Sequence, residues 1–181
     1  MKRTFLTIIL SLFFIQAISA QTAIVKEANP ADVASVDSIM KAVYEVISGD
    51  AGVKRDWDRF RTLFHPSARL IPTGKNPNTG VTGARALTVE EYIQRASPTM
   101  EKDGFFEKEI ARRGDFYGNI AQVFSTYAAF RKSTDKDPFM RGINSFQLLN
   151  DGKRWWVVTI YWQAESADTK IPKKYLKSKK S

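Results

Sequence analysis

The sequence predicts an α+β fold in which three N-terminal helices pack on a strongly curved, mainly antiparallel sheet. Two observations support this. Before residue 100, apolar side chains recur at helical spacing. After Phe105 the chain consists of long stretches rich in β-branched and aromatic residues, and turn signals separate them. Each helix has one apolar stripe, and a sheet is the surface that can bury all of these stripes together.

Residues 1–20 have the pattern of a secretory signal peptide. A basic start precedes an apolar run over residues 5–18, and the small residue Ala20 stands before the polar Gln21. The run is shorter than the roughly 20 residues that a membrane-spanning helix needs. We therefore expect cleavage after Ala20 and a periplasmic or secreted protein, with residues 21–29 as a short polar lead-in.

The composition excludes several kinds of site. The chain has no cysteine and only one histidine, His65. Disulfides, a thiol nucleophile, a thiolate metal site and a multi-histidine metal site are therefore impossible. We expect neither a metal nor a cofactor.

The positive charge is concentrated at the C-terminus. The formal net charge is +9 at pH 7, and six lysines lie in the last segment. Residues 167–181 are predicted to form a disordered basic tail, because runs of like charge usually stay solvated. The rest of the exported domain is near neutral, so we expect no nucleic-acid partner and at most weak tail contact with a membrane.

The first two helices have clear boundaries. Asn29 and Pro30 form a helix start, and the helix is expected to continue to Gly49. A second helix is expected over residues 53–64 and ends before Pro66. Its apolar face carries Trp57, Phe60 and Phe64. Its solvent face is expected to carry Lys54, Arg55, Asp58 and Arg61.

A short hairpin and a third helix follow. Residues 68–72 and 81–87 are predicted strands, and the loop 73–80 between them is rich in turn residues. Thr88 and Glu91 form a capping box that starts a helix, which is expected to weaken at Pro98.

The last part of the domain is predicted to be an antiparallel meander. Its strands are residues 105–113, 119–131, 139–149 and 154–165. Asp151-Gly152 between two apolar runs is a strong hairpin signal.

These local sequences resemble the NTF2-like superfamily, also called SnoaL-like or cystatin-like. Residues 57–68 resemble its second helix and first strand, and residues 141–147 with 151–162 resemble its closing hairpin. The resemblance covers residues 30–166. It implies a cone with a pocket between the sheet and the helices, and a homodimer formed through the outer face of the sheet. The fold hosts isomerases, dehydratases, hydrolases, cyclases and non-catalytic binding modules, so it does not imply one function.

The resemblance also allows one catalytic test. In the ketosteroid isomerases of this superfamily, the base lies just before a Pro-X-Gly on the first strand. Here Ile71 stands before Pro72-Thr73-Gly74, and it cannot take a proton. The catalytic candidate is instead His65, as a general acid or base, with a structural role at a helix end as the alternative.

The expected ligand-binding residues are aromatic and polar. They are Trp57, Tyr92, Tyr127, Arg141, Asn144 and Trp162. An aromatic pocket with a few polar groups is typical of a small-molecule site, although each aromatic side chain could equally be plain core. Arg141 could bind an anion or carbonyl, or could pair with a surface acid. Strict alternation places Arg141 and Asn144 on opposite faces of one strand, and Trp155 and Trp162 on opposite faces of the last.

Three carboxylates on the predicted strands are further candidates for the pocket. Glu107, Glu109 and Glu165 would become base candidates if they were buried in the cone. We expect them instead at solvated edges or in ion pairs.

Two functions remain open. In the first, the exported protein binds a small, mostly apolar molecule in its cone, with cofactor-free lyase, isomerase or hydrolase chemistry as an added option. In the second, it is a non-catalytic homodimeric module whose basic tail contacts anionic envelope surfaces.

Overall fold

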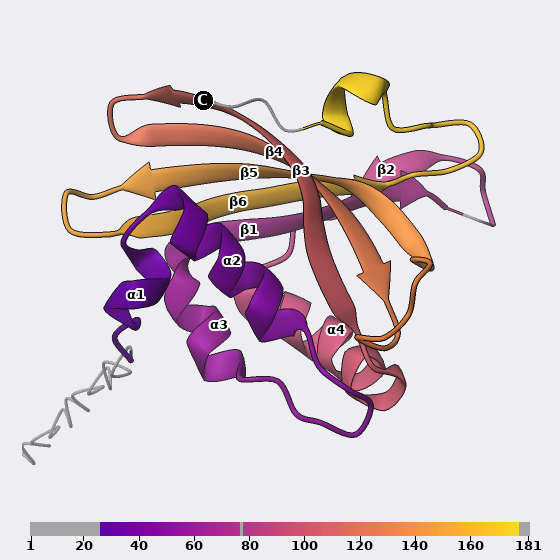
Figure 1. The fold of residues 1–181 in the computed structure, drawn as a ribbon, viewed down its shortest axis with the longest axis horizontal. Coiled ribbons are helices and arrows are strands. Elements are labelled where there is room, and N and C mark those ends of the chain that lie inside the picture. The colour runs from indigo at the N-terminus through magenta and orange to yellow at the C-terminus, as the bar shows by residue number, and fades with distance from the viewer. Residues whose placement is uncertain (1–25, 77, 178–181) are drawn as a thin grey trace, which may run out of the picture.

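The structure is a computed structural model that describes residues 26–76 and 78–177 (Figure 1). The predicted signal peptide, residues 1–20, lies outside the described residues. The helices are α1 (Pro30–Val33), α2 (Val36–Ile47), α3 (Trp57–Leu63) and α4 (Val89–Asp103), with a final 3-10 turn η1 (Lys173–Tyr175). The strands are β1 (Phe64–Lys75), β2 (Thr82–Ala84), β3 (Phe106–Tyr117), β4 (Ile120–Phe130), β5 (Met140–Asn150) and β6 (Trp155–Ala164).

The six strands form one curved sheet in the order β2-β1-β6-β5-β4-β3. Every neighbouring pair is antiparallel except β1 with β6, which is parallel. Helices α1 to α4 all lie on one side of this sheet (Figure 1). The α+β class, the mainly antiparallel sheet and the four-strand meander are therefore confirmed.

The first predicted helix is two helices. Asn29 caps α1 as expected, but Ser35 then starts α2 through a capping box with Ser38. Ser35 has an extended backbone, and each serine side chain accepts a hydrogen bond from the backbone N–H of the other. Such a reciprocal cap starts a new helix at that point.

The second helix starts later than expected and moves Arg55 into the core. Asp56 caps α3, so Arg55 precedes the helix instead of lying on its solvent face. The Arg55 guanidinium is buried and donates hydrogen bonds to five backbone carbonyls, those of Ile47, Gly49, Asp50, Val53 and Met100. A Cβ at Gly49 would lie 2.7 Å from Nη1 of Arg55, so any other residue there would push the guanidinium away from these carbonyls.

Two β-bulges change which side chains share a face. In β3 the register shifts between Glu109 and Ala111, and in β6 it shifts at Val158. One extra residue inverts the alternation beyond it. As a result Trp155 and Trp162 both pack against the core, although strict alternation had placed them on opposite faces.

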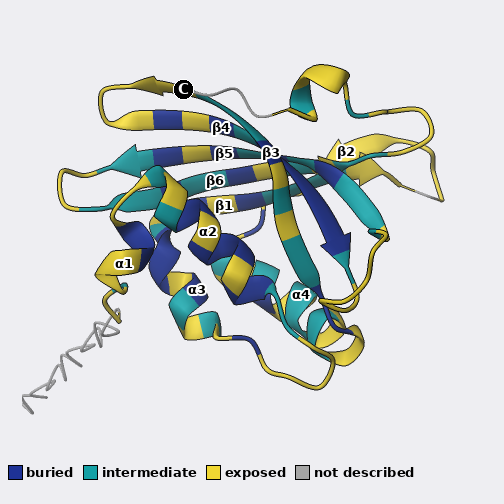
Figure 2. Ribbon diagram, in the orientation of Figure 1, coloured by how far each residue is buried: buried dark blue, intermediate teal, exposed yellow. Residues whose placement is uncertain are grey.

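The core lies between the helices and the concave face of the sheet. Most residues of α2 are buried, and buried residues also recur along the strands of the sheet that it covers (Figure 2). Pro98 does not end α4, which continues to Asp103. Among the described residues, no helix is long and apolar enough to cross a membrane.

Residues 167–177, the described part of the predicted basic tail, make specific contacts with the sheet. This segment crosses the side of the sheet opposite the helices (Figure 1). The carbonyl of Tyr175 accepts a hydrogen bond from Thr126 Oγ1 at 2.5 Å, and that of Lys174 accepts from Arg113 Nε at 2.6 Å. The Tyr175 ring packs 5.5 Å from the Phe124 ring. The backbone N–H of Ile171 also donates a hydrogen bond to Glu165 Oε1 at 3.2 Å. Backbone groups and one aromatic ring therefore contribute to holding the segment.

Removing residues 167–181 is therefore expected to lower the free energy of unfolding by about 1–3 kcal/mol, through lost apolar burial and the lost hydrogen bonds to Thr126, Arg113 and Glu165. Urea denaturation of the truncated and full chains measures the difference. The control replaces Lys170 and Lys173 by glutamine, which should leave stability within about 0.5 kcal/mol. Equal stability of the truncated and full chains would show that this packing contributes nothing.

Candidate functional site

A cavity of about 200 Å³ opens between the helices and the concave face of the sheet. Helices α2, α3 and α4 and strands β1, β3, β4, β5 and β6 all contribute to its wall. The lining is mostly apolar: Val43, Ile47, Phe60, Leu70, Ala96, Met100, Phe105, Met140, Phe146, Ile160 and Trp162. Its polar members are Tyr44, Tyr92, Glu107, Tyr127 and Asn144. The cone is therefore open, and a few polar groups converge in an apolar space.

Glu107 is the carboxyl group of this cavity. Its Oε1 accepts a hydrogen bond from Asn144 Nδ2 at 2.9 Å. Burial among apolar side chains raises the pKa of Glu107 to about 7, although the Asn144 donor opposes that rise. Near neutral pH this carboxyl is therefore present in both its protonated and its charged form. Such a group can donate or accept a proton.

Tyr127 places an unpaired hydroxyl in the same cavity. The ring is buried, and the hydroxyl has no hydrogen-bond partner among the described residues. A Cβ at Gly142, on β5, would lie 2.5 Å from that hydroxyl, so glycine leaves it the necessary space. A buried hydroxyl without a partner is unusual and is free to bind a ligand oxygen.

Tyr92 reaches the cavity from α4. Its ring stacks on Phe60 at 5.6 Å and meets the edge of Trp162 at 6.0 Å. Burial and the nearby Glu107 carboxyl raise the pKa of Tyr92, so its hydroxyl stays protonated and is a donor only in that form.

A chain of hydrogen bonds leads from Glu107 to the surface. Asn144 Nδ2 also donates to the Tyr44 hydroxyl at 3.1 Å, and Tyr44 contacts Ser125 Oγ at 2.6 Å. Ser125 Oγ donates to Glu109 Oε1 at 2.5 Å. We call these five residues, Glu107, Asn144, Tyr44, Ser125 and Glu109, the polar chain.

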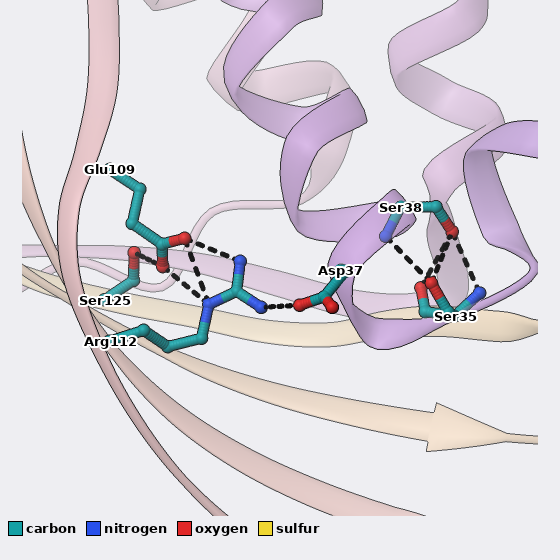
Figure 3. Close-up of polar contacts among 6 residues, drawn as sticks. All are labelled: Ser35, Asp37, Ser38, Glu109, Arg112 and Ser125. Carbon is teal, nitrogen blue, oxygen red and sulfur yellow. Dashed lines mark hydrogen bonds and ion pairs between the residues drawn. The ribbon is translucent and has the colours of Figure 1, made fainter. Parts of the chain in front are cut away.

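Arg112 holds the outer end of the polar chain (Figure 3). Its Nε donates to both Glu109 oxygens at 2.8 and 3.0 Å, and its Nη2 donates to Glu109 Oε2 at 2.6 Å. Arg112 also contacts Asp37, in the first turn of α2. The bulge at Ile110 is what brings Glu109 and Arg112 to the same side of β3 despite their odd spacing.

The structure brings four of the six expected ligand-binding residues together. Tyr92, Tyr127, Asn144 and Trp162 line the cavity. Trp57 does not line it: its ring packs against Phe60 at 5.5 Å, and its Nε1 donates to Glu101.

Arg141 also lies outside the cavity, on the opposite face of β5 from Asn144, as alternation predicted. Its Nε and Nη2 donate to Glu165 Oε2 at 3.0 and 2.7 Å. The alternative considered for Arg141, an ion pair with a surface acid, is therefore what the structure contains.

His65 does not line the cavity. It lies near the start of β1, where its Nδ1 is 2.8 Å from Ser67 Oγ and its ring meets the edge of Trp156 at 5.9 Å. Since no cavity residue contacts it through a described bond, the geometry favours the structural role for this histidine. No group of three or more metal-ligating side chains is found among the described residues.

Sequence reasoning misplaced Glu107. We expected it at a solvated edge or in an ion pair, and that was right only for Glu109 and Glu165. The signal was the opening of β3, Phe105-Phe106-Glu107, where a carboxylate follows two aromatic residues. The pairing with β4 decides the outcome, because it sets Glu107 on the face that turns inward.

No family model matches the sequence, and no curated protein matches it either. Solved structures do match the fold. A protein of unknown function with a cystatin-like fold from Nostoc punctiforme has a TM-score of 0.56 at 10% identity, over 78% of this chain and 97% of that chain. A putative calcium/calmodulin-dependent protein kinase II association domain from Xanthomonas campestris has a TM-score of 0.52 at 15% identity, over 73% and 86%. An NTF2-like protein of unknown function from Silicibacter pomeroyi has a TM-score of 0.49 at 13% identity, over 73% and 94%. The chain thus has a cystatin-like α+β fold.

Proposed function

We propose that the protein binds a small, mostly apolar molecule with one oxygen function inside its cone. The observation that carries this is that the half-buried Glu107 carboxyl, with its raised pKa, and the unpaired Tyr127 hydroxyl line the same mostly apolar cavity. An apolar wall binds the body of a ligand, and a few polar groups fix its orientation.

The size of the cavity limits the ligand. An apolar cavity of roughly 150 Å³ in another protein is known to hold one benzene molecule. The cone, at about 200 Å³, suits a single substituted ring or a short branched chain. A fused four-ring compound is too large for it without movement of the walls.

The polar groups suit a carbonyl or hydroxyl compound. Tyr127 can donate to the ligand oxygen, while Glu107 can exchange a proton near neutral pH. In a carbonyl ligand, the Glu107 carboxylate would take a proton from the adjacent carbon. The electrons of that C–H bond would form an enolate, whose oxygen the Tyr127 hydroxyl would stabilise. This cofactor-free proton transfer is the chemistry we propose, with Glu107 in the role that sequence reasoning assigned to His65.

Binding can be tested with phenol, cyclohex-2-enone and toluene as probes. NMR chemical-shift titration is expected to show saturable binding of the two oxygen compounds and weaker binding of toluene, because toluene leaves the polar groups unpaired. Replacing Ala96, on the cavity wall, by phenylalanine should abolish all three. His65→Ala is the matched control and should bind like the parent. Failure of every probe to bind, or unchanged binding in Ala96→Phe, would refute the proposal.

Proton transfer has a separate test. In D₂O the protein is expected to accelerate exchange of the hydrogens next to the cyclohex-2-enone carbonyl, and Glu107→Gln should lose at least about 100-fold of that acceleration, the usual scale for one general base. Binding without exchange would leave a non-catalytic binding protein.

We also propose export and homodimer formation, the first from residues 1–20 and the second from the superfamily resemblance. The mass of the chain isolated from periplasm or medium tests cleavage after Ala20. Sedimentation of the full chain tests the dimer. The segment 167–177 covers part of the outer sheet face, so a dimer through that face would have to include this segment.

A further inference from the structure

The five residues of the polar chain all have defined hydrogen-bond roles. Glu109 is paired with Arg112, so it is a charged carboxylate and can only accept. Ser125 therefore uses its one proton on Glu109 and must accept from Tyr44. Tyr44 in turn must accept from an N–H of Asn144.

The same reasoning orients the Asn144 amide. Its NH₂ group has two hydrogens, and the structure gives one to Tyr44 and the other to Glu107. An amide turned by 180° would present its oxygen to both neighbours. Tyr44 could not donate to that oxygen, because it already donates its single hydroxyl proton to Ser125 Oγ. The direction of each bond thus follows from the one before it, starting at the surface.

We propose that the Glu109 carboxylate sets the direction of the polar chain and thereby holds the Asn144 amide as a hydrogen-bond donor to Glu107. Glu109, Ser125 and Tyr44 are then positioning residues for the cavity carboxyl, although Glu109 itself does not line the cavity. This inference rests on the proposed function, because it concerns the same carboxyl group, but its test needs no ligand.

The consequence is a control of Glu107 acidity from outside the cavity. A donor at Glu107 stabilises its charged form and opposes the effect of burial. If the chain reverses, the amide oxygen faces Glu107, and only a protonated carboxyl can bond to it. Breaking the chain should therefore raise the pKa of Glu107 further.

Other charged and titratable groups near Glu107 must be kept constant in any test. Tyr44, Tyr92 and Tyr127 face it from α2, α4 and β4. A groove on its other side carries Lys41, Glu45, Lys108, Glu109 and Arg112. Substitutions that change the net charge of this groove would shift the Glu107 pKa directly, so the informative variants are uncharged or charge-balanced.

The experiment is a ¹³C NMR titration of the Glu107 carboxyl in the ligand-free protein, assigned by its absence in Glu107→Gln. Ser125→Ala frees the Tyr44 proton to turn toward Asn144, and Tyr44→Phe removes the acceptor. Each is expected to raise the pKa of Glu107 by about one unit, the scale of one lost hydrogen bond to a charged group. Thr62→Ala is the control, since it removes another buried hydroxyl that bonds only the Arg59 carbonyl. It should leave the Glu107 pKa unchanged.

The role of Glu109 needs a charge-balanced variant. Glu109→Gln with Arg112→Gln removes both charges of the pair and should raise the Glu107 pKa as Ser125→Ala does. Adding Ser125→Ala to that double variant should give no further rise, because one chain carries both effects. Additive rises, or equal pKa values in Ser125→Ala and Thr62→Ala, would overturn the proposal.

The outcome is separable from that of the binding test. A raised Glu107 pKa in Ser125→Ala, with no probe bound by the parent protein, would support the polar chain and refute the proposed ligand. Bound probes together with an unchanged Glu107 pKa in Ser125→Ala would support the proposed ligand and refute the role of the polar chain.

Discussion

Replacing Glu107 by glutamine is expected to stabilise the folded protein by about 2–3 kcal/mol at pH 8 and to leave its stability unchanged at pH 4. The pKa of Glu107 is about 7 in the folded protein, against an ordinary value of 4.5. Between these pH values the folded state binds more protons than the unfolded state, so stability falls as pH rises. By about pH 8 the loss is nearly complete, because the carboxyl is then charged in both the folded and the unfolded state. Glutamine avoids the buried charge and therefore avoids the loss.

Urea denaturation of the parent and of Glu107→Gln between pH 4 and 8 measures this difference. The free energies of unfolding of the two proteins, plotted against pH, are expected to coincide at pH 4 and to diverge progressively up to pH 8. Glu27→Gln, at an exposed position in the lead-in, is the control and should run parallel to the parent. Parallel curves for Glu107→Gln would mean that its carboxyl has an ordinary pKa, and the proposed acid–base role would fail with it.

Replacing Arg55 by methionine is expected to lower the free energy of unfolding by about 3–5 kcal/mol, the usual effect of breaking a buried polar cluster. Methionine preserves much of the apolar stem but leaves five backbone carbonyls without their donor. Those carbonyls belong to the end of α2, the loop after it and the last part of α4. Ile47 and Met100, two of the residues that provide them, also line the cavity. The substitution should therefore disturb the cavity wall as well as lower the overall stability.

Thermal and urea denaturation of Arg55→Met measure the effect, with Arg61→Met as the matched control. Arg61 is an exposed arginine that pairs with Asp58 and Glu90 on the surface, so its replacement should change stability by less than about 1 kcal/mol. Arg55→Lys should recover only part of the loss, because an ammonium group cannot bond to carbonyls in five directions. Similar losses in Arg55→Met and Arg61→Met would show that the buried contacts contribute no more than surface pairs.

Much of the architecture follows from local signals. Asn29 and Thr88 cap helices where the sequence predicts them, and Asp151-Gly152 forms the turn between β5 and β6. These signals are readable because a cap or a tight turn involves residues that are near neighbours in the sequence. Tyr92, Tyr127, Asn144 and Trp162 line the cavity, as predicted from the aromatic and polar side chains that small-molecule sites usually contain.

Other features depend on contacts between distant segments. The bulges at Ile110 and Val158 arise from pairing with neighbouring strands, and each inverts the alternation that sequence reasoning must assume. The sequence predicts Arg55 at the surface, because its five hydrogen-bond acceptors are backbone carbonyls and the residue pattern does not reveal them. In the basic tail the lysine charges are visible in the sequence, whereas the backbone carbonyls that accept hydrogen bonds from Thr126 and Arg113 are not.

The sequence by itself determined the α+β class and the order of the elements, because apolar periodicity and turn chemistry are properties of short segments. It also predicted three of the aromatic residues of the cavity wall, Tyr92, Tyr127 and Trp162. Only the tertiary structure decided that Glu107, rather than His65, is the titratable group in the cone. The face of β3 that turns inward is set by its register with β4, and the pKa of Glu107 is set by side chains from other elements of the fold. A carboxylate gains its chemical character from its surroundings, and those surroundings exist only after the chain has folded.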